Sequence, residues 1–174
     1  VNKNEELDIA IANKLYDIKV PLISIRSPLT CECSIDICHV REPGGTEISE
    51  EIRSVLLSNR DSEMASRCEA LLMSASRAQL TKSIIIPLLK NGKWVIADRY
   101  SDSTLAYQGG GRSIDFTSLL EINKFATYGI EPDISFFIDI DAEEGFQRRE
   151  HLPSDRIENA GVEFQSEIRN KYFE

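Results

Sequence analysis

Glycine is missing from the first 43 residues of this 174-residue chain, and all nine glycines lie at Gly44 or beyond. A Walker-type phosphate loop needs glycines so that successive backbone N–H groups can surround phosphate oxygens. The pattern G-x4-G-K-[S/T] occurs nowhere in the sequence, because Gly92-Lys93 is followed by Trp94. The sequence therefore contains no loop of this kind, and Gly92-Lys93 predicts a turn before a strand.

Long apolar runs and an excess of basic residues are also missing. No apolar stretch approaches the roughly 20 residues that span a bilayer, and no basic segment precedes a short apolar one as in a signal peptide. The formal net charge of −9 argues against nucleic acid, whose binders carry a basic face. We expect a cytoplasmic protein without a membrane or nucleic-acid partner. A small anionic ligand remains compatible, because a few clustered arginines set the local field.

Cysteine is scarce, with Cys31, Cys33, Cys38 and Cys68 in the whole chain. The first three, together with His39, form the pattern C-x-C-x4-C-H, which lacks the C-x2-C pairs of structural zinc sites. We predict apolar filling in or near a strand and no metal ligation by these residues. Disulfides are not expected in a cytosolic protein.

Hydrophobic periodicity predicts alternating strands and helices in a single domain over residues 1–174. Continuous apolar runs at 94–97 and 134–138 predict strands that are buried on both faces, as in parallel sheets covered by helices. Shorter strands are predicted at 22–25 and 34–40. Helices are predicted at about 5–18, 47–58, 63–90 (ended or kinked by Pro87), 115–128 and 158–172. This alternation is typical of an α/β three-layer domain.

The residues that follow the apolar run 94–97 carry the strongest chemical signal. Ligands of open α/β sheets bind at the carboxyl ends of the strands, where this sequence has Asp98-Arg99-Tyr100. Taken alone, these residues fit a solvated strand end equally well. Hydroxyl, amide and guanidinium groups follow within three helical turns, the mixture that a base-and-phosphate pocket needs; they are Ser103, Thr104, Tyr107, Gln108 and Arg112. The intervening Gly109-Gly110-Gly111 permits close approach of the backbone to a ligand.

Three further segments are candidates for the same site. Arg41–Thr46 follows the strand at 34–40 and forms either a plain turn or a loop that shapes a pocket, with Arg53 on the next helix. Arg77 stands on a weakly polar helix among small residues, although an exposed arginine is the commonest explanation. The arginine-dense stretch at about 145–157 is either a solvated charged loop or a mobile lid whose arginines neutralise a transferring phosphoryl group.

Together these segments resemble the bacterial thymidylate kinase family. REPGGT at 41–46, DRYSDSTLAYQGGGR at 98–112, PDISFFIDID at 132–141 and SDRIEN at 154–159 occur in the order and approximate spacing of that family. The resemblance covers roughly residues 40–174. It implies a P-loop NTPase-like fold with a parallel sheet of about five strands flanked by helices. It also implies transfer of a phosphoryl group from ATP to dTMP with Mg²⁺, giving dTDP and ADP in dTTP biosynthesis, and a homodimer.

The resemblance also assigns roles to individual residues. Arg77 and Arg99 resemble the pair that holds the dTMP phosphate, with help from Arg53. Thr104 and Gln108 resemble the residues that read the thymine edge. Tyr107 packs by the deoxyribose, Met73 replaces a phenylalanine that stacks on the base, and Glu42 and Asp98 lie near the phosphates and magnesium. Arg148, Arg149 and Arg156 resemble lid arginines, Arg156 on the ATP side. Pro43 and Ser103 complete the substrate-binding set, and Arg99, Asp98, Arg148 and Arg149 the catalytic set.

The chain departs from the family over residues 1–40. The family begins with a strand, a Gly-rich phosphate loop, a helix and a second strand before REPGGT. Residues 26–40 leave too little room for that crossover, which needs at least about 10–12 residues besides the strand. Residues 1–18 resemble the tail with which the family ends, so we expect a rearranged or incomplete chain. Two hypotheses follow: an active thymidylate kinase, or a catalytically incomplete dTMP-binding module without the ATP loop. Another nucleoside-monophosphate kinase is disfavoured by the Tyr107-Gln108-Gly109 sequence.

Overall fold

The computed structural model describes residues 36–149, 151 and 154–174, and Ile35–Glu174 form one compact unit. The helix predicted at 5–18 and the strand predicted at 22–25 lie outside the described residues. Within them, two parallel strands form the sheet: β1 (Ile37–Arg41) and β2 (Trp94–Asp98). The register pairs Ile37 with Trp94 and Arg41 with Asp98, so that both carboxyl ends lie at the same edge. The predicted strands at 34–40 and 94–97 are thereby confirmed over most of their length.

The crossover between the two strands is helical. It consists of α2 (Glu47–Leu57), α3 (Ser66–Leu80), the π-helical segment η2 (Thr81–Ile85) and α4 (Ile86–Lys90). Helix α2 begins where predicted, because the Thr46 side chain accepts a hydrogen bond from the Ser49 N–H at 3.1 Å and satisfies one free donor of the first turn. The predicted helix at 63–90 begins at Ser66 and continues through Pro87. Since Pro87 has no N–H to donate, the usual i→i−4 pattern is interrupted there, and a π-helical segment precedes it.

The second half of the described chain adds short helices. These are α5 (Ser101–Thr104), the π-helical η3 (Leu105–Gly111), α6 (Phe116–Ala126), α7 (Ala142–Arg149), the 3₁₀ turn η4 (Glu158–Ala160) and α8 (Val162–Tyr172). The helix predicted at 115–128 is α6, which Asp115 caps through the Ser118 N–H at 2.8 Å. The helix predicted at 158–172 is divided at Gly161, whose φ of 93° is open to glycine and unfavourable for other residues.

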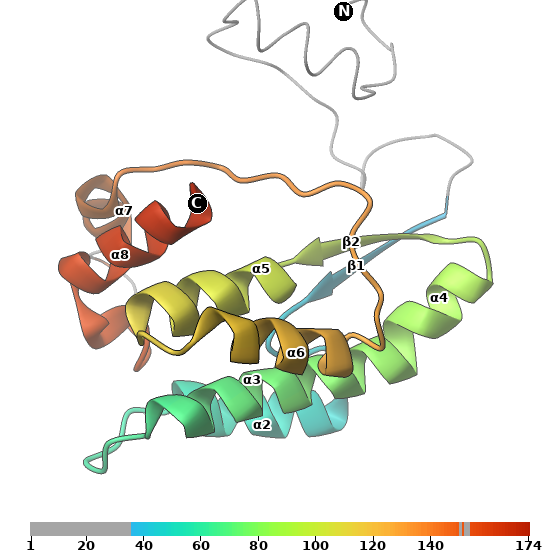
Figure 1. Ribbon diagram of the computed structural model, residues 1–174, viewed down its shortest axis with the longest axis horizontal. Helices are drawn as coiled ribbons and strands as arrows, with labels where there is room; N and C mark the ends of the chain where they lie inside the picture. Colours follow the sequence, from blue (N-terminus) through green and yellow to red (C-terminus); the bar gives the residue numbers. More distant parts are fainter. Residues whose placement is uncertain (1–35, 150, 152–153) are drawn as a thin grey trace, which may run out of the picture. The chain divides into compact units, whose positions relative to one another are not determined.

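The core of the sheet lies on one face of β1 and β2. Val40, Leu80 and Ile85 are buried together, and Val95 and Tyr100 pack against them. Figure 1 shows α3 and α4 on this side of the two strands. Burial of 94–97 on both faces was predicted, but Trp94 is 61% exposed, because no described helix covers the opposite face. Two strands are formed in the described part of the chain, where about five were predicted for the whole fold.

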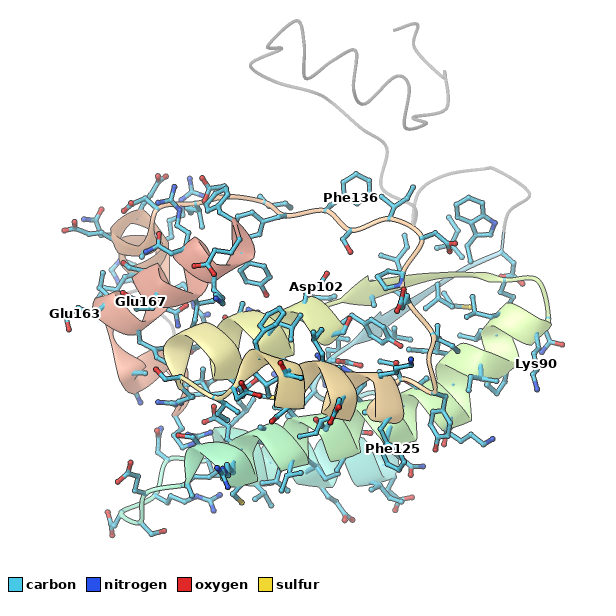
Figure 2. All side chains as sticks on the ribbon, in the orientation of Figure 1. Lys90, Asp102, Phe125, Phe136, Glu163 and Glu167 are labelled. Carbon is cyan, nitrogen blue, oxygen red and sulfur yellow. The ribbon has the colours of Figure 1, made fainter. Side chains whose placement is uncertain are left out.

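The predicted buried strand at 134–138 is wrong. Residues 134–140 form neither helix nor strand, and Phe136 and Ile138 are 77% and 88% exposed. Figure 2 shows Phe136 pointing away from the neighbouring helices. Side chains hold the segment instead: Phe137 stacks on Tyr172 at a centroid distance of 4.8 Å. A strand needs a partner for its backbone groups, and an apolar run does not specify that partner.

Candidate functional site

The site is built at the carboxyl ends of β1 and β2, where α/β sheets bind ligands. The register that pairs Arg41 with Asp98 continues for one more residue, since the Glu42 N–H donates to the Asp98 carbonyl at 3.0 Å. This hydrogen bond sets the loop that follows β1 beside the Asp98-Arg99-Tyr100 sequence that follows β2. Two of the four predicted segments therefore meet, as the sequence indicated.

The loop Arg41–Thr46 is held from three sides. The Pro43 carbonyl accepts hydrogen bonds from Arg41 Nη1 at 3.1 Å and from Arg53 Nη1 at 2.8 Å. The Gly44 N–H donates to Ser76 Oγ at 3.2 Å, which joins the loop to α3. Arg53, whose direction the sequence left open, thus supports the loop from α2. The loop is a braced element of the site and no free turn.

An ion pair between Glu42 and Arg77 lies at the centre. Arg77 is 3% exposed, and its Nε donates to Glu42 Oε2 at 2.7 Å. Its Nη1 donates to Thr104 Oγ1 and Asn123 Oδ1, both at 2.7 Å, and its Nη2 donates to the Tyr100 carbonyl at 2.9 Å. Burial raises the pKa of Glu42 above its usual value, although Arg77 opposes that shift. Arg77 therefore joins both strand ends to α5 and α6.

Arg99 lies on the more exposed side of the site. Its φ of 67° places a non-glycine residue in the left-handed region, a backbone strain that Ser113 and Tyr128 share. The guanidinium sits over the Tyr107 ring, 5.0 Å from its centroid. Close by in the sequence, Ser103 Oγ and the Tyr172 hydroxyl are hydrogen-bonded at 2.8 Å. These contacts bring together Arg99, Ser103 and Tyr107, and Tyr172 of α8 covers them through its hydrogen bond with Ser103.

A second buried carboxylate, Glu69 of α3, collects three donors. Gln108 Nε2 donates to its Oε1 at 3.0 Å, Arg112 approaches both oxygens at 3.2 Å, and Arg156 Nη2 donates to Oε2 at 2.7 Å. Burial alone would raise the pKa of Glu69, but these donors outweigh it and hold the pKa below its usual value. Glu69 is therefore the ionised centre that ties η3 and the segment before η4 to α3.

Comparisons with known proteins agree with this geometry. Residues 24–174 match the sequence profile of the family described as Thymidylate kinase. The chain belongs to the thymidylate kinase family. The thymidylate kinase of Chlorobium phaeobacteroides is 44% identical over 153 residues, which cover 82% of this chain and 69% of that protein. The thymidylate kinase of Fervidobacterium nodosum is 48% identical over 141 residues, covering 81% and 70%.

A solved structure gives the same answer for the fold. The crystal structure of thymidylate kinase from Ehrlichia chaffeensis superposes with a TM-score of 0.63 at 32% identity, over 79% of this chain and 66% of that one. The predicted family, the P-loop NTPase-like α/β fold and the enzyme class, a nucleoside-monophosphate kinase, are confirmed. The predicted function, that of a thymidylate kinase, is confirmed at the level of the family. The chain spans about two thirds of the length of the relatives it matches.

The last two of the three glycines after Gln108 allow close packing of helix α8. A Cβ at Gly111 would lie 2.4 Å from Phe164 of α8, and one at Gly110 would lie 2.8 Å from Lys171. The interpretation that Gly109-Gly110-Gly111 lets the backbone approach a ligand is therefore wrong for the last two glycines, which a protein helix approaches. The sequence could not distinguish a ligand from a helix as the close neighbour.

The predicted lid separates into two parts. Arg148 and Arg149 lie exposed at the end of α7, where they pair with Glu144 and Glu158. Arg156, predicted as a lid arginine on the ATP side, donates to Glu69 and, at 2.8 Å, to the Leu56 carbonyl. The backbone N–H of Arg156 also donates to the Leu57 carbonyl at 3.1 Å. The residues around Arg156 are thus docked on α2 and α3.

Two buried residues that join the predicted site segments were not singled out from the sequence. Glu69 was not singled out, because its partners lie 39 to 87 positions away and it resembles any charge on an amphipathic helix. Asn123 was also missed, although it accepts from Arg77 and donates to the Ser101 carbonyl at 3.1 Å. Met73 of α3, predicted to lie beside the base, is half-buried. Among the described residues, no helix is long and apolar enough to cross a membrane.

Proposed function

We propose that this protein transfers a phosphoryl group from ATP to dTMP, giving dTDP and ADP, and that its described residues form the acceptor site. The observation that carries the proposal is the meeting of the loop 41–46 with the segment 98–108 at the end of the parallel strand pair. Family membership supports the same chemistry. Phosphoryl transfer needs chiefly positioning and charge neutralisation, which a braced and arginine-rich strand end can provide.

The phosphate of dTMP is held by Arg99, with Arg77 behind it. Arginine binds phosphate through paired N–H···O hydrogen bonds, and Arg99 is an exposed residue directly after β2, with its guanidinium over the Tyr107 ring. The guanidinium of Arg77 already donates to four protein groups, so phosphate reaches it by displacing a neutral acceptor such as Thr104 or Asn123. Arg53 acts indirectly, by holding the Pro43 carbonyl.

The nucleoside is bound by η3 and the helices beside it. Thr104 and Gln108 are four residues apart and both buried, and they read the polar edge of thymine. Met73 packs against the base, while Tyr107 and Ser103 lie by the deoxyribose. Contacts to base and sugar help to hold the acceptor oxygen in line with ATP. Pro43 is buried and keeps the loop of Glu42 against this pocket.

The donor side involves ATP with Mg²⁺. The described residues hold no group of three metal-ligating side chains. Magnesium is usually bound by one or two carboxylates together with substrate phosphates. Asp98 is exposed at the end of β2, and Glu42 Oε1 has no hydrogen-bond partner in the described part of the chain. Asp98 would hold the ion with Glu42 nearby, and the ion would neutralise charge on the phosphates. Arg148 and Arg149 add positive charge from α7.

A coupled assay of ADP release tests the activity. We expect turnover that requires dTMP, ATP and Mg²⁺ together. Binding of dTMP without turnover would support the alternative, a dTMP-binding module that lacks the ATP loop. The expected homodimer is checked separately by light scattering of the same sample. A monomer at micromolar concentration would contradict the dimer and leave the kinase proposal unaffected.

A further inference from the structure

Glu69 joins three segments that are far apart in the sequence. It lies in the first turn of α3 and is 1% exposed. It accepts hydrogen bonds from Gln108 and Arg112, which are four residues apart, and from Arg156. Its two oxygens thus meet two cations and one amide. The two arginines more than balance the single negative charge of Glu69. Gln108 is the one uncharged group that contacts this carboxylate.

The charge of Glu69 decides which end of the Gln108 amide can face it. An ionised carboxylate only accepts hydrogen bonds, and the two arginines keep Glu69 ionised by holding its pKa below the usual value. Only the NH₂ end of Gln108 can therefore point at Glu69, and the carbonyl end must point elsewhere. Burial of both side chains excludes water that would compensate for a rotated amide.

We propose that Glu69 is a positioning residue that fixes the orientation of the Gln108 amide and thereby sets the preference for thymine over cytosine. The proposal rests on the proposed function, in which Gln108 reads the base. Thymine presents an N–H at ring position 3 and a carbonyl at position 4, whereas cytosine presents an unprotonated nitrogen and an amino group. An amide that pairs with one edge must rotate by half a turn to pair with the other. By blocking that rotation, Glu69 leaves cytosine with mismatched donors and acceptors.

The proposal is tested by replacing Glu69 with a residue of the same shape that can donate hydrogen bonds as well as accept them. Glu69→Gln keeps the shape, but its amide can accept from Gln108 or donate to it. Arg112→Gln is the matched control, because it removes one ion pair of the same cluster and leaves the Glu69–Gln108 hydrogen bond in place. The readout is the ratio of dTMP to dCMP affinity, measured by titration calorimetry. Unfolding by urea measures the stability of each variant.

We expect the wild type and Arg112→Gln to prefer dTMP to a similar degree. In Glu69→Gln the ratio should fall at least about tenfold, since a buried polar mismatch is the main source of such discrimination. In the background Gln108→Leu, the Glu69→Gln substitution should change the ratio no further. An unchanged ratio in Glu69→Gln, or an equal fall in Arg112→Gln, would overturn the proposal. A wild type that binds both nucleotides alike would refute the proposed function as well.

A measurement on the wild type covers the case in which Glu69→Gln does not fold. The side-chain NH₂ of Gln108, observed by ¹⁵N-correlated NMR, should exchange with solvent far more slowly than that of the exposed Gln147. Exchange of the two amides at the same rate would contradict a fixed amide. Slow exchange of Gln108 is the result expected of a buried amide whose NH₂ donates to Glu69.

Discussion

Replacing Arg77 by methionine removes the charge that balances a buried carboxylate while filling most of the same volume. Glu42 is buried, and in the described part of the chain Arg77 is its side-chain partner. Breaking a buried ion pair by removing one member costs about 3–5 kcal/mol, because the remaining charge is left without compensation. Thr104, Asn123 and the Tyr100 carbonyl also lose their donor. We therefore expect Arg77→Met to lose about 3–5 kcal/mol, a large part of a typical total stability.

The double variant Glu42→Gln/Arg77→Met isolates the charge from the packing. It removes the buried carboxylate as well, so it should be more stable than Arg77→Met alone, by about 1–3 kcal/mol. The sign of this difference is the sharper prediction. If Arg77 contributed only hydrogen bonds to its neutral partners, the second substitution would bring no recovery.

Acidity provides an internal check on the same pair. Burial already raises the pKa of Glu42 in the folded protein above its usual 4.5, and Arg77 limits the rise. A group whose folded-state pKa is raised favours folding when it is protonated. The stability of Arg77→Met should therefore increase relative to wild type as the pH falls from neutral toward 4.5, and this gain should be absent from the double variant.

Urea unfolding followed by far-ultraviolet circular dichroism is the suitable assay. The helices dominate that signal, whereas the exposed Trp94 is a poor reporter of the core. A loss of less than about 1 kcal/mol in Arg77→Met, or a double variant no more stable than the single one, would refute the buried ion pair as the centre of the site.

Three further predictions concern packing, capping and pH. Gly111→Ala should cost about 1–3 kcal/mol, because the added Cβ would lie 2.4 Å from Phe164; the additional change Phe164→Leu should recover part of the loss in the same urea assay. Thr46→Ala should cost about 1 kcal/mol through loss of the cap on α2, whereas Thr46→Ser should cost little. Because folding lowers the pKa of Glu69, its contribution to stability is complete above pH 4.5 and is lost as the pH falls through the folded-state pKa. In thermal unfolding measured over a series of pH values, Glu69→Gln should reduce the loss of stability at acidic pH. An unchanged loss would contradict the role given to Glu69.

Local chemistry allowed much of the fold to be predicted. The Thr46 cap and the apolar spacing behind it located α2 within one residue of its observed end, and Gly92 with Asp98 bounded β2. These signals act over a few residues, so one sequence suffices to find them. The helix start at Ser66 was missed by three residues, because Ala65 gives no side-chain hydrogen bond as a cap.

Contacts between distant segments could not be predicted in the same way. The apolar run at 134–138 has the composition of a buried strand, but the strand requires a partner that the run itself does not name. Likewise the glycines after Gln108 indicate a close approach without indicating that Phe164 makes it. Glu69 is one carboxylate among 29 acidic residues until folding brings Arg112 and Arg156 to it. Family resemblance predicted the site residues, and the structure adds which of them contact one another.

Titration of dTMP into the protein, with thymidine and the variant Arg99→Ala for comparison, tests the acceptor site most directly. The account predicts that the wild type binds dTMP more tightly than thymidine, because thymidine lacks the phosphate that Arg99 holds. In Arg99→Ala, dTMP binding should weaken by about 1.5–3 kcal/mol, the value of a hydrogen bond to a charged group, while thymidine binding should change little. Equal affinity of the wild type for dTMP and thymidine, or unchanged dTMP affinity in Arg99→Ala, would contradict a dTMP site at the end of β2.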